Sequence, residues 1–140
     1  MRRFAAVSLV LLGACRLPGE TGGGGAACFV DEECRAGEVC ARDEHCWPAS
    51  EVRRVMATWT VRGQPASEAT CARAPDLHII FDGNVPDDLG FSPVPCVLGQ
   101  FVVDKLPRAF TRVELGVDDV GPWRTATITS SGTATFDLPL

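Results

Sequence analysis

Hydrophobic and polar positions follow two different patterns along this chain. Residues 4–12 form an almost unbroken apolar run, whereas from residue 56 onward short segments alternate between hydrophobic and polar side chains. Alternation with a period of two is typical of a β-strand with one buried face. The pattern predicts strands at 56–61, 76–82, 96–103, 110–117, 123–129 and 133–138, the last two forming a closing hairpin across 130–132.

Glycine and proline mark the connections between the predicted strands. The segment 83–95, which holds three prolines and two glycines, is expected to be a long loop. Residues 67–73 are expected to form a short helical turn with Ser67 as its N-cap. Short strands at regular spacing, with almost no helix, predict a mainly β fold in which residues 49–140 form an antiparallel β-sandwich. Further turns are expected at 62–65, 106–109 and 118–122.

The apolar run has the layout of a secretory signal peptide. Arg2 and Arg3 precede it, small residues follow it, and it is far shorter than the roughly 20 residues that a membrane-spanning helix needs. Residues 1–14 are therefore predicted to be a signal peptide that is removed on export. Residues 15–27, with four consecutive glycines, are predicted to be a tether before the folded part.

The segment Leu12-Gly13-Ala14-Cys15 resembles the lipobox of bacterial lipoproteins. In that class of protein the cysteine thiol receives a diacylglycerol and the new amino terminus is acylated. The resemblance implies a mature chain that begins at Cys15 and is anchored to a membrane by lipid. Arg16, rather than Asp, follows the cysteine, and by the Gram-negative sorting pattern this implies the outer membrane.

The number of cysteines agrees with export. The chain has seven, and an odd number in an exported protein indicates one thiol outside the disulfides. If Cys15 carries lipid, the other six can pair as three disulfides in an oxidising compartment. These six are Cys28, Cys34, Cys40, Cys46, Cys71 and Cys96.

Four of the cysteines lie in a predicted disulfide-rich module at 28–48, with five residues between neighbours. So short a segment cannot bury enough apolar surface to fold on a hydrophobic core, which favours two disulfides as its support. Interleaved pairing, first with third and second with fourth, would make it compact, but four cysteines allow three connectivities and the spacing does not choose among them. With Asp31 and Gly37, these cysteines resemble short cysteine-rich repeats of bacterial surface lipoproteins.

Zinc is the alternative use of these four cysteines. Structural zinc sites usually contain closely spaced cysteine pairs, which this segment lacks, and an oxidising compartment removes free thiolates. The acidic residues of the module also lack the alternating ligands of a calcium loop. No metal and no cofactor is therefore expected.

Several short motifs follow one another in a characteristic order over most of residues 56–140. They are Trp59-Thr60-Val61, Gly63-Gln64-Pro65-Ala66-Ser67, Cys71, Cys96, Gly99-Gln100-Phe101, Leu106-Pro107 and Phe110. Their order resembles that of bacterial lipoprotein domains with a transthyretin-like or carboxypeptidase-regulatory-like sandwich, although those tend to have Pro-Gly and Tyr where this chain has Arg108-Ala109 and Phe110. The resemblance implies a transthyretin-like or Ig-like sandwich with a disulfide between Cys71 and Cys96.

Charge excludes one class of partner. The net charge is −5 without a basic stripe, and removal of Arg2 and Arg3 makes it more negative. Nucleic acids need clustered Lys and Arg for their phosphates, so no nucleic-acid partner is expected. An acidic chain is also not attracted to anionic lipid, so any membrane contact would come from the acyl chains.

Residues suited to catalysis are few. There are only two histidines, His45 and His78. A hydrolase would need a serine, His78 and a carboxylate such as Asp76 or Asp82 to converge, and no nucleophile-turn motif is present. No catalytic residue is therefore expected.

The tryptophans offer the clearest binding chemistry. Trp59 lies within a predicted strand and is expected in the core, whereas Trp47 and Trp123 adjoin prolines near turns. An exposed tryptophan beside carboxylates can stack against a sugar ring. The candidate binding residues are Trp47, Trp123, Asp82, Asp87 and Asp88.

Together these features predict a non-catalytic protein, anchored by lipid in the cell envelope, with a structural or protein-interaction role. The expected position is the periplasmic or surface side of the outer membrane. The alternative is a carbohydrate- or peptide-binding surface module that uses loop 83–95 and the exposed tryptophans. A hydrolase is the least favoured of the three hypotheses.

Overall fold

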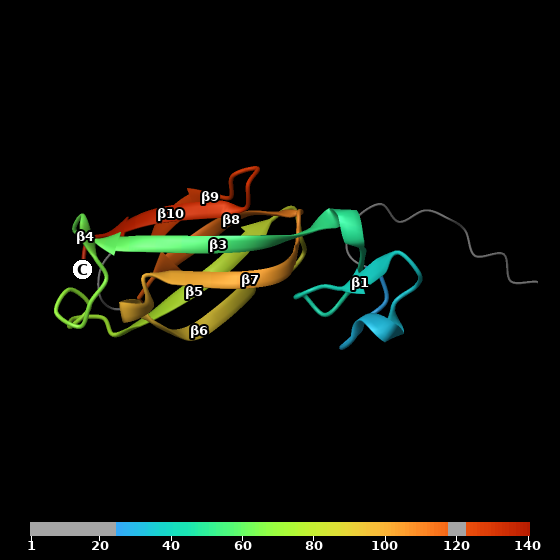
Figure 1. The fold of residues 1–140 in the computed structure, drawn as a ribbon, viewed down its shortest axis with the longest axis horizontal. Coiled ribbons are helices and arrows are strands. Elements are labelled where there is room, and N and C mark those ends of the chain that lie inside the picture. The colour runs from blue at the N-terminus through green and yellow to red at the C-terminus, as the bar shows by residue number, and fades with distance from the viewer. Residues whose placement is uncertain (1–24, 118–122) are drawn as a thin grey trace, which may run out of the picture.

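The computed structural model describes residues 25–117 and 123–140. The predicted signal peptide, Cys15, most of the predicted tether and the predicted turn at 118–122 lie outside the described residues. Figure 1 shows a small module at one end of an elongated β-sandwich. Within the described part of the chain, no helix is long and apolar enough to span a membrane.

The module is supported by two disulfides rather than by a hydrophobic core. Cys28 pairs with Cys40 and Cys34 with Cys46, with Cα atoms 5.7 and 5.5 Å apart. The connectivity is therefore the interleaved one of the three that the spacing allowed. Apart from Cys28 and Cys46, Ala41 is the module's buried apolar residue among those described. Its elements are η1 (Asp31–Glu33), β1 (Glu38–Cys40) and β2 (Cys46–Pro48), with β1 and β2 antiparallel, and η2 (Ala49–Glu51) leads into the sandwich.

Two sheets form the sandwich. In the first, β3 (Val52–Val61) is central: β10 (Thr133–Leu138) lies along one edge, and β7 (Gln100–Pro107) and β4 (Gln64–Pro65) lie along the other. The strands of the second sheet, in spatial order, are β6 (Leu89–Pro95), β5 (Asp76–Gly83), β8 (Phe110–Gly116) and β9 (Arg124–Thr127).

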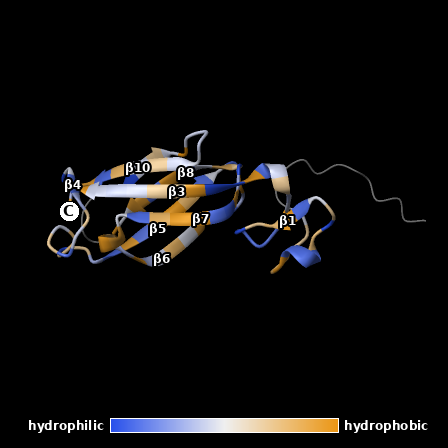
Figure 2. Cartoon of the chain, viewed as in Figure 1, coloured by the Kyte–Doolittle hydropathy of each residue, from blue (hydrophilic) through white to orange (hydrophobic). Residues whose placement is uncertain are grey.

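The core lies between the two sheets, where alternate residues of each strand are buried. Figure 2 shows the resulting alternation of hydrophobic and hydrophilic positions along the strands. The predicted strands at 76–82, 110–117 and 133–138 are confirmed, as is the mainly β fold with packed sheets whose strand pairs are antiparallel except for β3 with β10. The alternating inward residues of β3, β5 and β8 are Val55, Ala57, Trp59, Val61, Leu77, Ile79, Phe81, Val113 and Leu115.

The long loop predicted at 83–95 is wrong for its second half. Residues 89–95 form β6, and the connection is limited to 84–88. Pro93 and Pro95 misled the prediction because proline normally breaks a sheet. β6 is an edge strand with an irregular register against β5, and an edge strand tolerates residues that lack an N–H group.

The strand predicted at 96–103 begins later than expected. Residues Cys96–Leu98 form a 3-10 turn, η3, and β7 then starts at Gln100 and continues to Pro107. The helical turn predicted from Ser67 is present, because the Cys71 amide donates to the Ser67 carbonyl at 2.9 Å. Ser67 Oγ also accepts from the Thr70 amide at 3.2 Å, as an N-cap does.

The predicted closing hairpin is wrong. β9 pairs with β8 in the second sheet, whereas β10 pairs with β3 in the first and runs parallel to it. Residues 128–132 thus carry the chain from one sheet to the other. Gly132 allows this close passage: its φ is +79°, its carbonyl accepts from the Met56 amide at 2.8 Å, and a Cβ there would collide with the Arg54 carbonyl. Alternation identifies a strand but does not identify its partner.

Candidate functional site

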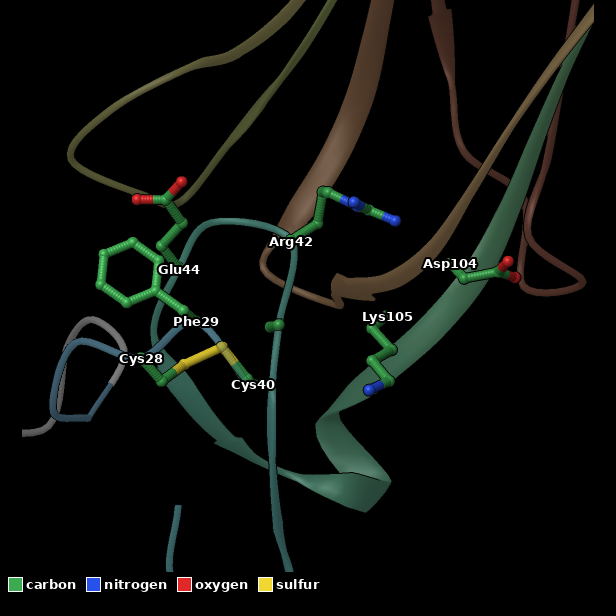
Figure 3. A pocket seen from close by; sticks show the side chains of 8 residues that line it. Cys28, Phe29, Cys40, Arg42, Glu44, Asp104 and Lys105 are labelled. Carbon is green, nitrogen blue, oxygen red and sulfur yellow. A yellow bond between two sulfur atoms is a disulfide. The ribbon is translucent and has the colours of Figure 1, made fainter. Parts of the chain in front are cut away.

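A hollow of about 340 Å³ lies where the module meets the sandwich. Figure 3 shows the Cys28–Cys40 disulfide, Phe29 and Glu44 on the module side of this hollow, and Lys105 and Asp104 on the sandwich side. A hollow that combines an aromatic ring with charges of both signs can take an apolar group and orient polar groups beside it. The lining residues are Cys28, Phe29, Cys40, Ala41, Arg42, Glu44, Asp104 and Lys105.

Lys105 joins the two parts of the molecule. It lies in a β-bulge, where Asp104 and Lys105 together oppose Arg54 of β3, and its φ is +54°. A bulge turns a side chain away from the direction that the strand would give it. Lys105 Nζ lies 2.7 Å from both carboxylate oxygens of Asp31, and its carbonyl accepts from the Arg42 amide at 3.1 Å.

The Asp31 carboxylate accepts hydrogen bonds from both the sandwich and the module. Its Oδ1 accepts a hydrogen bond from Lys105 and another, at 3.0 Å, from the Cys40 amide. The Lys105 hydrogen bond, followed by that from Cys40, lowers the pKa of the Asp31 carboxyl below its ordinary value. The carboxylate therefore keeps its charge, and its contact with Lys105, to a lower pH than an isolated aspartate would.

Phe29 projects from the module beside the hollow with 81% of its surface exposed. Its position is restrained, because Cys28 is in a disulfide and the Phe29 amide donates to Glu33 Oε2 at 2.6 Å. The next residue, Val30, is 50% exposed. Two adjacent apolar side chains held outward on a disulfide-bonded frame form a small surface suited to contact with another molecule.

Among the described residues, no hydrogen bond or ion pair joins any two of the predicted binding residues Trp47, Trp123, Asp82, Asp87 and Asp88. Trp47 lies in the module, where its Nε1 donates to Asp43 at 3.0 Å. Asp82 is paired with Arg112 at 2.7 Å. Trp123 lies instead beside His78, and four residues of an extended strand, about 13 Å, separate His78 from Asp82 along β5. Asp87 and Asp88 are exposed in the 84–88 connection, beyond the Asp82 end of β5.

The structure places a serine beside His78. Ser92 Oγ lies 3.3 Å from His78 Nε2 because β6 pairs with β5. Among the described residues, however, no carboxylate is hydrogen-bonded to this imidazole, and the pair lies on the outward face of the sheet rather than in the hollow. Trp59, by contrast, is 3% exposed and lies in the core as predicted.

The cysteines of the module lie close enough to suggest metal binding. The sulfur atoms of Cys28, Cys34 and Cys46 are all within 4.8 Å of one another. Each of them is in a disulfide, so none offers the thiolate that a zinc site needs. Three disulfides in so small a chain are typical of an oxidising, extracytoplasmic compartment.

Sequence reasoning missed Phe29 and the contact between Asp31 and Lys105. Phe29 had a usable signal, since a large apolar residue next to a cysteine in a segment without a core has nowhere to be buried. The contact of Asp31 with Lys105 had no signal in the sequence, because 74 residues separate the two.

No protein family, curated protein or solved structure matches this chain. The resemblances to lipoprotein sequences stay predictions, and the function has to be inferred from the chain's own residues.

Proposed function

We propose that this chain is a lipid-anchored protein of the bacterial cell envelope, held at the outer membrane, with a non-catalytic interaction role. One observation carries the anchor. The three disulfides use six of the seven cysteines, so the chain has no second cysteine for Cys15. Cys15 is also the cysteine of the Leu-Gly-Ala-Cys segment, and lipidation gives its thiol a use.

The surface at Phe29 and Val30, together with the adjacent hollow, supports the interaction role. It follows Cys15 by 14 residues in sequence, so a lipid on Cys15 would keep this surface within about 50 Å of the membrane. Direct contact with anionic lipid is disfavoured because Asp31, Glu32 and Glu33 follow immediately. A protein partner in the envelope fits the exposed aromatic ring better, since aromatic residues commonly anchor protein interfaces.

Replacing Cys15 tests the anchor. In a Gram-negative host, the wild-type chain is expected in the outer-membrane fraction, with the mass of a chain starting at Cys15 plus acyl groups and with six thiols that appear only on reduction. Cys15→Ser is expected to lose the acyl mass and the detergent-phase partitioning. Arg16→Asp, a matched control, is expected to keep the lipid but move to the inner membrane. A wild-type chain that starts at Met1, with free thiols, would contradict the proposal.

A photo-crosslinking residue in place of Phe29 tests the interaction role. Benzoylphenylalanine at position 29 is expected to form a discrete protein adduct in intact envelopes, because the side chain at this position is exposed and its backbone amide is held by Glu33. Val97, 43% exposed in η3 of the sandwich, is the matched control position and should give no such adduct. Equal adducts at both positions, or none at position 29, would contradict an interface at Phe29.

A further inference from the structure

The outward face of the second sheet carries a row of side chains that the hollow and the anchor do not use. The row consists of Ser92 on β6, His78 on β5 and Trp123, which lies next to Gly116 of β8. The register aligns these positions, because His78 pairs directly with Gly116 and Ser92 reaches His78 from the neighbouring strand. We call these residues the Trp123 row.

The Trp123 indole packs directly on the backbone of Gly116. A Cβ at position 116 would lie 2.8 Å from Cδ2 and 3.0 Å from Cγ of the Trp123 indole. No side chain other than hydrogen therefore allows the indole to approach the strand this closely. Gly116 is buried although it faces outward, as alternation with the inward Leu115 requires, because the indole covers it.

Hydrogen-bonding groups lie beside this ring. The imidazole of His78 meets the indole edge to face, with ring centroids 6.2 Å apart and planes at 80°. Ser92 Oγ lies 3.3 Å from His78 Nε2. One step along the strands, Glu114 accepts a hydrogen bond from Thr125 at 3.4 Å. The face thus offers an aromatic ring, hydroxyls, an imidazole and a carboxylate in adjacent positions.

The surface beside these groups is open at Gly90 of β6, which has no atom within 4 Å of where a Cβ would lie. Its partner on β5, Ile80, is half-buried and faces outward like His78. The positive charge of Arg112 on this face is paired with Asp82, and Glu114 adds a negative charge. A phosphate polymer needs concentrated positive charge, which this face does not supply.

We propose that the Trp123 row binds a neutral polysaccharide chain. The apolar C–H face of a sugar ring would stack on the Trp123 indole, and its hydroxyl groups would exchange hydrogen bonds with His78, Ser92 and Glu114. An extended face suits a polymer that crosses several strands better than a single sugar. This site shares only Trp123 with the binding residues predicted from the sequence, and it does not depend on the lipid anchor or on Phe29.

Affinity electrophoresis of the purified full chain tests the site, with soluble mixed-linkage glucan, xyloglucan and galactomannan in the gels. At least one of these is expected to retard the wild-type chain. Trp123→Ala is expected to weaken that retardation roughly tenfold or more. Gly116→Ala keeps the indole but displaces it, and is expected to weaken binding as well. Trp47→Ala, the matched control in the module, is expected to bind like the wild type.

Fluorescence gives a second readout that needs no change at Trp123. In Trp47→Phe, the remaining emission comes from Trp123 and from Trp59, which is buried. The polysaccharide that retards the wild type is therefore expected to shift this emission to shorter wavelength. If none of the three gels retards the wild type, the proposal is overturned. It is equally overturned by retardation that survives Trp123→Ala, by loss of binding in Trp47→Ala, or by emission that stays unchanged at saturation.

Discussion

Trp59→Ala is expected to lower the free energy of unfolding by about 4 kcal/mol, the middle of the range for removing a buried aromatic side chain. Trp59 is 3% exposed on the central strand of the first sheet. Its Nε1 also donates to the Cys96 carbonyl at 2.8 Å, which ties β3 to η3. Chemical denaturation followed by far-ultraviolet circular dichroism measures the change without relying on the tryptophan that is removed.

Trp59→Phe separates the packing from the hydrogen bond. This variant keeps most of the apolar volume and is expected to cost about 1–2 kcal/mol. The loss is limited because the Cys96 carbonyl also accepts from the Gly99 amide at 3.2 Å, so it is not left without a donor. If Trp59→Ala and Trp59→Phe destabilised the protein equally, the indole would contribute through its N–H group and not through its volume.

Removing the Cys71–Cys96 disulfide with paired alanine substitutions is expected to cost about 3 kcal/mol. The two residues are 25 apart in sequence and both are buried, so the bond closes a long loop of the unfolded chain. For a domain of this size, such a loss lowers the melting temperature by roughly 10–20 °C. Thermal and urea denaturation of the double variant against the wild type measure both quantities.

The denaturant dependence identifies where this disulfide acts. A bond that restrains the unfolded chain should, when removed, let that chain expand and so increase the m-value. Loss of packing in the folded state would lower the stability with an unchanged m-value. A double variant that stays within about 0.5 kcal/mol of the wild type would show that the loop-closure estimate does not apply to this bond.

The sequence was informative where local chemistry decides the structure. Alternation located β5, β8 and β10 because each has one buried face, and cysteine spacing located the module because a core was impossible there. It failed where the partner strand decides. Pro93 and Pro95 are compatible with β6 only because that strand lies at an edge. β9 and β10 follow each other in sequence but pair with β8 and β3, in different sheets.

In the candidate sites, too, some residues can be recognised from local sequence, whereas others are brought together by strand pairing. Trp123 stands out in the sequence, but its neighbours are set by register: His78 and Gly116 meet only because β5 and β8 pair. The hollow depends on the bulge at Asp104 and Lys105, and a bulge is not visible in a hydrophobic pattern. Residues that act alone can therefore be proposed from the sequence, whereas residues that act together need the strand order.

The parallel pairing of β3 with β10 has a consequence for biogenesis. Thr58 of β3 pairs with Thr135, so the first long strand to emerge finds its neighbour almost at the end of the chain. Pairings so distant in sequence form slowly. Until residue 138 has been translocated across the membrane, one edge of β3 stays unpaired. During this interval β3 is a template for association with other chains. An interrupted product lacking β10 would expose that edge permanently, and we expect the chaperones and proteases of the oxidising compartment to recognise it.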